Sequence, residues 1–368
     1  MARFIHTADW QIGRSFAGYG EGASGLLYEE RFLVVEHIAT LTREEKIGRV
    51  LVAGDVFENR PPSNQDLRRL FGILGQSGPT WLLLPGNHDH AGAGGPWERA
   101  RELDLVPGNA RVLDSPGPVI LEDHGLVVLP APLRTRQPQY DVTEEAFAHA
   151  TGESLIRVGV AHGSVTGVLP EGADATNPIE ARRAASANLD YLALGDWHGS
   201  LRIDGRTWYS GTPETDRFRN NQSGQVLLVD IPGPGAVPTV TAMPTGRFRW
   251  HELRPTLNVD SDVDRSGQEL AGYGIDDLVK VTFSGSLSLR ARETLDHLRE
   301  EMEARVRYLA WDAGDVETKV EADDLDSLSL SPLARAILEE LESRRGEVAE
   351  AVFTEAVVAL VSLDRELS

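Results

Sequence analysis

Aspartate, asparagine and histidine side chains follow five apolar segments of this 368-residue sequence. Asp9 is the first of them, and the others lie in GDVF (54–57), GNHD (86–89), AHG (161–163) and GDWHG (195–199). Carboxylates, amide oxygens and imidazoles are the groups with which proteins bind divalent cations. A single such residue after a strand is more often structural, but an ordered set of five indicates a metal centre.

The composition limits what can bind that metal. The sequence contains no cysteine, which excludes disulfides, thiolate metal sites and a cysteine nucleophile. No apolar stretch approaches the roughly 18 residues of a transmembrane helix, and no basic and apolar leader opens the chain. We therefore expect a cytoplasmic protein without a membrane partner, whose metal ligands are His, Asp, Glu, Asn or Gln.

The elements that must place these side chains alternate between strands and helices. Apolar residues recur at helical spacing over 32–41, and a second helix is expected over 64–76, with Ser63 or Asn64 as its N-cap. This order predicts an α/β domain, in which ligands collect where the strands end. The segments expected to be buried strands include RFIHTA, RVLVA, TWLLLP, GLVVLPA, LIRVGVAH and YLALGD.

The ordered motifs resemble those of the calcineurin-like metallophosphoesterases, which read D-x-H, G-D, G-N-H-[DE], H and G-H-x-H. Within that family the chain looks most like the SbcD-type DNA repair exonucleases. Matching motifs cover about residues 1–250. Beyond residue 250 the resemblance depends only on the order in which the capping domain and the helical tail follow. The segments that carry it are FIHTADWQIG, LVAGDVFENRPPS, LLLPGNHD, DYLALGDWH and YSGTPE.

The resemblance implies a metallophosphoesterase β-sandwich flanked by helices (αββα), followed by a small α+β capping domain and a helical C-terminal tail. The corresponding ranges are 1–246, 247–322 and 323–368. Two amphipathic helices are expected in the tail, over 333–345 and 348–366, and each must bury one face. Packing on their own domain and docking on a partner are both open interpretations.

The resemblance also implies two divalent cations that clamp a phosphodiester and activate a bridging water, with Asp55 as the carboxylate that touches both. The implied ligands of the first metal are Asp9, Asp55 and His198, with Gln11 beside them. Those of the second metal are Asp55, Asn87, His162 and Asp196.

His88 follows a ligand but is not itself expected to bind metal. By resemblance it points at the phosphate, stabilises developing charge and protonates the leaving oxygen. Asp89 either orients His88 as a hydrogen-bond acceptor or stabilises its own turn. Near the ligands in sequence, Arg14 and Arg60 are interpreted as solvated surface arginines and Trp10 as a packed residue.

Two positions depart from the family pattern. Gln11 stands where the family usually has histidine, and Asp196 stands where it has the first histidine of G-H-x-H. Both changes replace nitrogen by oxygen, which favours Mn²⁺ or Mg²⁺ over Zn²⁺. We therefore expect Mn²⁺ dependence with a loosely held first metal, with Gln11 bound to it directly, through water, or not at all.

The charge distribution bears on the substrate. The net charge is −21, and residues 251–368 contribute 13 basic against 27 acidic residues. Such a surface repels DNA unless a basic patch or partner intervenes. The leading hypothesis is a Mn-dependent DNA repair exonuclease or endonuclease, a homodimer that works with an SMC-like ATPase. The alternatives are a phosphodiesterase or phosphatase for nucleotides or other phosphoesters, and a non-catalytic binding subunit.

Overall fold

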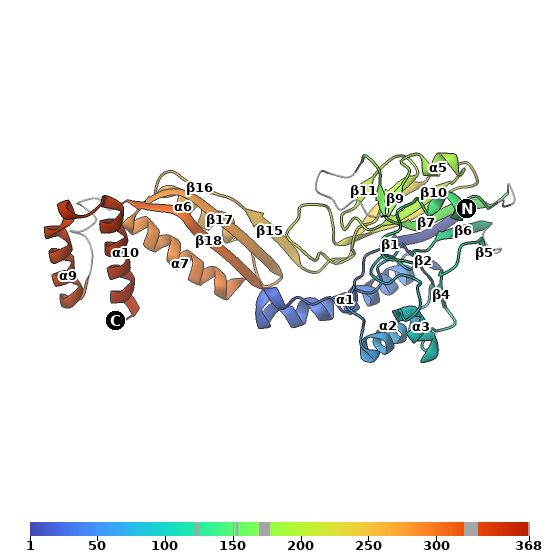
Figure 1. Ribbon diagram of the computed structural model, residues 1–368, viewed down its shortest axis with the longest axis horizontal. Coiled ribbons are helices and arrows are strands. Elements are labelled where there is room, and N and C mark those ends of the chain that lie inside the picture. The colour runs from blue at the N-terminus through green and yellow to red at the C-terminus, as the bar shows by residue number, and fades with distance from the viewer. Residues whose placement is uncertain (122–124, 150, 152–153, 169–176, 320–329, 367–368) are drawn as a thin grey trace. The chain divides into compact units, whose positions relative to one another are not determined.

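The computed structural model describes residues 1–121, 125–149, 151, 154–168, 177–319 and 330–366 (Figure 1). The chain divides into two compact units, Met1–Arg249 and Trp250–Ser368. The sequence placed domain boundaries after residues 246 and 322, and the second of these lies outside the described residues. The three-part division therefore stays a prediction. Among the described residues, no helix has the length and apolar character needed to cross a membrane.

Two six-stranded sheets form the first unit. Strands β1 to β4 of the first sheet run parallel, and β13 and β14 extend it antiparallel. In the second sheet β6, β7, β10 and β12 run parallel between antiparallel edge strands. The first sheet has the order β14 (Thr239–Pro244), β13 (Gln225–Ile231), β1 (Ala2–Thr7), β2 (Arg49–Val52), β3 (Thr80–Leu83), β4 (Ala110–Val112). The second has the order β11 (Leu201–Arg202), β12 (Thr207–Tyr209), β10 (Tyr191–Gly195), β7 (Ile156–His162), β6 (Leu126–Ala131), β5 (Val119–Leu121).

The two sheets pack face to face through one hydrophobic core. Phe4 and Leu82 of the first sheet belong to the same buried cluster as Val128 and Val158 of the second. Each sheet alternates its side chains, so the residues between these positions point to the outer faces. Those outer faces are apolar as well, and helices must cover them.

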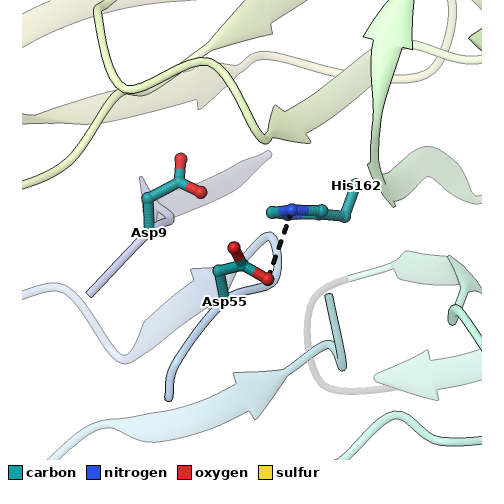
Figure 2. Close-up of side chains that lie close together, drawn as sticks. All are labelled: Asp9, Asp55 and His162. Atoms are coloured by element: carbon teal, nitrogen blue, oxygen red, sulfur yellow. Dashed lines mark ion pairs between the residues drawn. The ribbon is translucent and has the colours of Figure 1, made fainter. Parts of the chain in front are cut away.

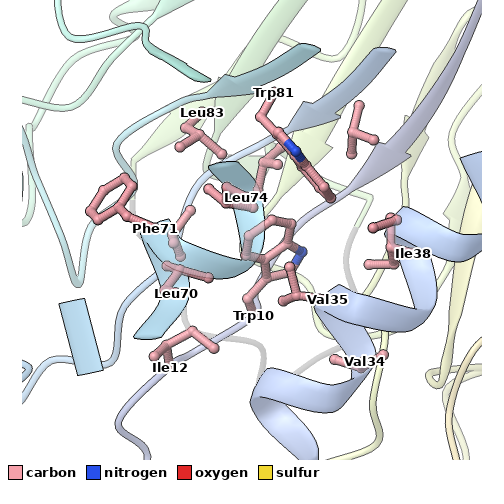
Figure 3. Close-up of a cluster of buried hydrophobic side chains, with 14 of the residues drawn as sticks. Trp10, Ile12, Val34, Val35, Ile38, Leu70, Phe71, Leu74, Trp81 and Leu83 are labelled. Atoms are coloured by element: carbon pink, nitrogen blue, oxygen red, sulfur yellow. The ribbon is translucent and has the colours of Figure 1, made fainter. Parts of the chain in front are cut away.

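Helices α1 (Gly20–Glu44), α2 (Asn64–Gln76) and α3 (Pro96–Glu102) pack on the outer face of the first sheet. Trp10 and Trp81 meet edge to face at 5.7 Å within this cluster, where Figure 3 shows them between α1 and α2. Trp10 is fully buried, so the interpretation that it packs is confirmed. Ser63 caps α2 in a reciprocal capping box with Asp66.

The second sheet has its own outer cluster, to which the short helices α4 (Thr143–Ala146) and α5 (Arg183–Ser186) contribute. The two helical layers and two sheets together confirm the expected αββα sandwich. Small elements complete the unit: η1 (Ala17–Tyr19) leads into α1, and β8 (Ser164–Val165) pairs with β9 (Pro178–Ile179).

The second unit contains a small α+β fold with its own core. The long strand β17 (Asp277–Ser288) pairs in parallel with β18 (Tyr308–Lys319), and α7 (Leu289–Arg305) connects them. These three elements form a strand–helix–strand unit. Strands β15 (Arg249–Leu253) and β16 (Thr256–Leu257) and helix α6 (Ser261–Leu270) complete it.

The tail forms α9 (Pro332–Ser343), η3 (Arg345–Glu347) and α10 (Glu350–Glu366). One face of each long helix is buried in a shared cluster that includes Leu338, Phe353 and Val357, together with Leu289 at the start of α7. Their apolar faces therefore pack partly within the second unit.

Candidate metal centre

Five strand ends bring their polar side chains together at one edge of the sandwich. Strands β1, β2 and β3 of the first sheet precede Asp9, Asp55 and Asn87, and β7 and β10 of the second end at His162 and just before Asp196. Figure 2 shows Asp9, Asp55 and His162 converging, and their ligand atoms lie within 4.8 Å of one another. All three residues are buried, so the cluster is an internal site rather than an exposed group of acids.

The loops after β1 and β2 hold their acids in an unusual backbone conformation. Asp9, Gln11 and Asp55 have φ angles of 55°, 49° and 52°, in the left-handed region that ordinary residues avoid. The two loops run side by side, because Asp9 N donates to Gly54 O and Gln11 N to Asp55 O, both at 3.0 Å. Conformations of this kind cluster at functional sites, where the surrounding structure over-determines them.

Two glycines of the motifs are required by close contacts at the site. A Cβ atom on Gly54 would lie 2.2 Å from His162 Nδ1, and one on Gly86 would lie 2.2 Å from Asp55 Oδ1. No side chain fits at either position without moving a candidate ligand. The glycines of GDVF and GNHD are therefore part of what places Asp55 and His162.

His162 presents a lone pair to a ring of oxygens. Its Nδ1–H donates to Ala53 O at 2.9 Å, which leaves the lone pair on Nε2. That nitrogen lies 3.1 Å from Asn87 Oδ1, 3.3 Å from Asp55 Oδ1 and 3.8 Å from Asp196 Oδ1. Acceptors that converge in this way require a cation or a proton between them, so the donor set fits a divalent metal.

The electrostatics of these residues lead to the same conclusion. Burial raises the pKa of Asp9 to about 6, and burial also raises the pKa of Asp196. Burial alone would lower the pKa of His162, but the charges of Asp55, Asp9 and Asp196 raise it to about 9. The concentrated negative charge favours binding of a cation.

Asp196 is connected to the loop after β1 and to β8. Its backbone N donates to Asp9 Oδ1 at 3.2 Å, and its Oδ2 accepts from Ser164 Oγ at 2.8 Å. Its φ of 100° is again in the left-handed region. A carboxylate held in this way faces the cluster where the family pattern has an imidazole.

His198 is oriented by Asp216, which the sequence analysis did not identify. Asp216 Oδ2 accepts from His198 Nδ1 at 2.9 Å, and because a carboxylate only accepts, the proton sits on Nδ1. Burial would raise the pKa of Asp216, but His198, Arg14 and Arg217 hold it well below its usual range. Carboxylate–histidine pairs of this kind fix the tautomer of metal-binding histidines.

Replacing Asp216 with asparagine is expected to weaken metal binding or activity about 10- to 100-fold, because His198 loses the acceptor that fixes its tautomer. Isothermal titration with Mn²⁺ and a phosphodiesterase assay measure the two effects. Asp230→Asn is the matched control, since Asp230 pairs with Arg3 at 3.1 Å outside the cleft. Equal effects of both substitutions would contradict the role given to Asp216.

Gln11 lies beside His198, with its amide oriented by Arg14. Its Oε1 accepts a hydrogen bond from Arg14 Nη1 at 2.5 Å, and its Nε2 lies 3.1 Å from His198 Nε2. The amide N–H therefore donates to the lone pair that would face a first metal. Because Arg14 already occupies Oε1, this geometry favours a water-mediated or indirect role over direct ligation by Gln11.

Gln11→His is expected to tighten binding of the more weakly held Mn²⁺ about tenfold, or about 1.4 kcal/mol, with activity retained. The imidazole would add a nitrogen donor at a position that borders the cluster. Titration calorimetry of chelator-treated protein measures the change. Weaker binding in the variant would instead show that the glutamine amide already serves the metal better than histidine.

His88 lies next to Glu58 rather than Asp89. Its Nδ1 is 3.0 Å from Glu58 Oε1 and 3.7 Å from Asp55 Oδ2. Burial lowers the pKa of His88, but Glu58 and Asp55 outweigh it, so the pKa is raised above its ordinary value. Glu58 was not identified from the sequence, although it comes three residues after Asp55.

Asp89 holds the turns around the site. Its Oδ1 accepts from Gly86 N at 2.6 Å and its Oδ2 from Phe57 N at 3.1 Å. Both oxygens therefore bind backbone groups, which is the turn-stabilising alternative given for this residue. By joining the loops after β2 and β3, Asp89 positions Asp55 and Asn87 indirectly.

Five of the seven candidate ligands line a cleft of about 660 Å³, and the lining is rich in arginine. The interpretation of Arg14 as a solvated surface residue is wrong: its side chain is 21% exposed and its Nη1 lies 2.7 Å from Asp216 Oδ2. Arg60 is exposed, as expected. The cleft is lined by the arginines 14, 60, 136, 217 and 219, together with Gln11, Asp55, Asn87, His88, Asp196 and His198.

Comparison with known proteins places this site in a family. The SbcD subunit of the nuclease SbcCD from Bacillus subtilis is 26% identical over 287 residues, covering 68% of this chain and 69% of that protein. Its counterpart from Rhodobacter capsulatus is 26% identical over 316 residues, covering 72% and 75%. The DNA double-strand break repair protein Mre11 of Methanosarcina acetivorans is 23% identical over 256 residues, covering 67% of this chain but 39% of that protein. The model of the calcineurin-like phosphoesterase family matches residues 2–200, and the chain belongs to that family.

Proposed function

We propose that the chain is a Mn²⁺-dependent phosphodiesterase that cleaves DNA at its ends as the nuclease subunit of a complex with an SMC-like ATPase. The observation that carries this proposal is the buried cluster of Asp9, Asp55 and His162, of which Asp55 lines an arginine-lined cleft together with His88. Two of the relatives are named as one subunit of a nuclease, and the third as a DNA break repair protein.

The residues divide the chemistry of hydrolysis between them. When bound, two divalent cations neutralise the phosphate and lower the pKa of the attacking water. Asp55 would hold both cations, and Asp9, Asn87, His162, Asp196 and His198 would supply the remaining ligands. As the water oxygen forms its bond to phosphorus, the bond to the leaving oxygen breaks, and His88 gives that oxygen a proton.

Glu58 supports this role of His88. Burial would raise the pKa of Glu58, but the adjacent His88 lowers it to about 2, so the carboxylate is ionised beside the ring. An ionised partner keeps the ring protonated to a higher pH than a free histidine. The raised pKa of His88 thus favours the protonated ring that a proton donor requires.

The local charge of the cleft supports a DNA substrate despite the net charge of −21. Among the described residues, Arg60, Arg136 and Arg219 line the cleft without a protein acceptor for their guanidinium groups. Guanidinium groups bind phosphate oxygens in bidentate geometry. A strand can therefore be bound locally while the rest of the surface repels it.

Exposed apolar residues on the tail helices support the proposal of a partner subunit. Beyond the faces buried in their shared cluster, α9 and α10 expose Leu333 (70%), Ile337 (42%), Val352 (54%) and Leu363 (55%). Apolar side chains at helical spacing suit a helix-in-groove or helix-on-helix contact with another subunit. An ATPase docked here would supply further DNA-binding surface. Homodimer formation and a cytoplasmic location stay predictions.

Manganese is favoured because oxygen donors outnumber nitrogen donors in the proposed set. Calorimetry with Mn²⁺, Mg²⁺ and Zn²⁺ on chelator-treated protein tests this choice. Tight Zn²⁺ binding without any response to Mn²⁺ would refute it.

A substrate panel in Mn²⁺ tests the nuclease assignment. Labelled linear DNA, cyclic nucleotides and bis-p-nitrophenyl phosphate are compared under one condition. Cleavage of the DNA supports the proposal. Hydrolysis of the small esters without any DNA cleavage supports a phosphodiesterase for nucleotides, which the acidic surface favours. No hydrolysis of any substrate supports a non-catalytic binding subunit.

A further inference from the structure

The cleft continues past His88 into a second pocket. This side pocket has a volume of about 310 Å³ and shares Glu58, Asn59, Asn87, His88 and Arg136 with the main cleft. The volume lies at the lower end of the roughly 300–1,000 Å³ found for small-molecule sites. His88 therefore lines both spaces, which share Asn87, whereas Gln11, Asp55, Asp196 and His198 line the main cleft but not the side pocket.

Two arginines give the side pocket positive charge. Arg99 projects from α3, and Arg136 comes from the loop after β6 and lines both spaces. Within the part of the chain that the structure describes, neither guanidinium contacts a carboxylate or another acceptor. Both arginines are therefore available to bind an anionic group of the substrate at this end of the cleft.

The remaining walls suit the rest of a nucleotide. Pro61 and Pro62 provide rigid apolar surface, and Gly94 and Gly95 line the pocket without side chains. His90 Nδ1 accepts from Gly92 N at 3.2 Å, so its Nε2 carries the proton and can donate into the pocket. The apolar surface of the two prolines suits a sugar and a base better than it suits an inorganic phosphate.

We propose that the side pocket binds the leaving-group nucleotide and that Arg99 and Arg136 contact the phosphate beyond the scissile one. The proposal rests on the phosphodiesterase function proposed above. In that function His88 donates its proton to the departing oxygen, and His88 also lines the side pocket, so the departing nucleotide would lie beside this pocket. The pocket would thus make the enzyme prefer a chain with at least two consecutive phosphates over a simple ester.

Dinucleotide substrates with and without an additional phosphate test this assignment. The full-length protein in Mn²⁺ is assayed with TpT, with pTpT and TpTp, and with bis-p-nitrophenyl phosphate, which has no further phosphate. We expect a terminal phosphate on one side to lower KM about tenfold. In Arg99→Gln and Arg136→Gln that advantage should fall below about threefold, so that the KM for the phosphorylated dinucleotide rises far more than the KM for bis-p-nitrophenyl phosphate.

Matched controls lie two residues away from each arginine. Arg101 and Arg134 line neither space, so Arg101→Gln and Arg134→Gln should retain the tenfold advantage. If both test variants also retain it, the side pocket is not the phosphate subsite and the inference fails alone. If the parent hydrolyses bis-p-nitrophenyl phosphate but none of the dinucleotides, the proposed function fails with it.

Discussion

Asp55→Asn is expected to lower phosphodiester hydrolysis at least about 10³-fold, because the bridging charge contributes several kcal/mol to the bound metals and each 1.4 kcal/mol is a factor of ten in rate. The asparagine oxygen can still accept from His88 N, which Asp55 Oδ1 does at 3.0 Å. The local turn should therefore survive, and the loss should come from the missing charge. Steady-state kinetics in Mn²⁺ measure it.

The control for this substitution shares its backbone conformation. Asp104 has a φ of 51°, close to the 52° of Asp55, but it lies exposed on the surface and lines neither space. Asp104→Asn should leave both the rate and the Mn²⁺ affinity unchanged. A variant at position 55 with near-parental activity would remove Asp55 from the metal centre.

His88→Asn is expected to lower kcat for DNA about 10²- to 10⁴-fold while leaving Mn²⁺ affinity within about twofold, because the role proposed for His88 is to donate a proton and not to bind the metal. The loss should be much smaller for bis-p-nitrophenyl phosphate, whose leaving group departs readily as an anion. Kinetics with both substrates, together with calorimetry, separate these effects. His149→Asn, an exposed histidine outside both spaces, is the control.

The substrate comparison also distinguishes two roles for this histidine. Equal losses on DNA and on bis-p-nitrophenyl phosphate would show that His88 stabilises charge on the phosphate and does not protonate the leaving oxygen. A loss of Mn²⁺ affinity of tenfold or more would contradict both roles and make His88 a ligand.

The β-sandwich and the convergence of its strand ends can be predicted from the sequence, because both follow from the pattern of apolar residues. Apolar runs indicate buried parallel strands, and parallel strands end at a common edge, so the approach of Asp9, Asp55 and His162 follows. The glycines before the ligands are visible in the same motifs. A Cβ atom at Gly54 or Gly86 would lie 2.2 Å from His162 or Asp55, which explains why those positions have no side chain.

The surroundings of the ligands are less predictable, because they depend on side chains from distant loops. Asp216 contacts His198 from a loop, and no sequence pattern connects the two residues. The side chain of Arg14 turns towards the site because it contacts Asp216 and Gln11. Glu58 carries a usable signal in its spacing from Asp55, but only the fold shows that it is closer to His88 than Asp89 is.

Diffraction at the manganese absorption edge from crystals grown with Mn²⁺ tests the central claim most directly. We predict two anomalous peaks that share Asp55, one also contacted by Asp9 and His198 and the other by Asn87, His162 and Asp196. A single peak, or peaks that leave Asp55 without contact to both ions, would contradict a two-metal centre built on these strand ends.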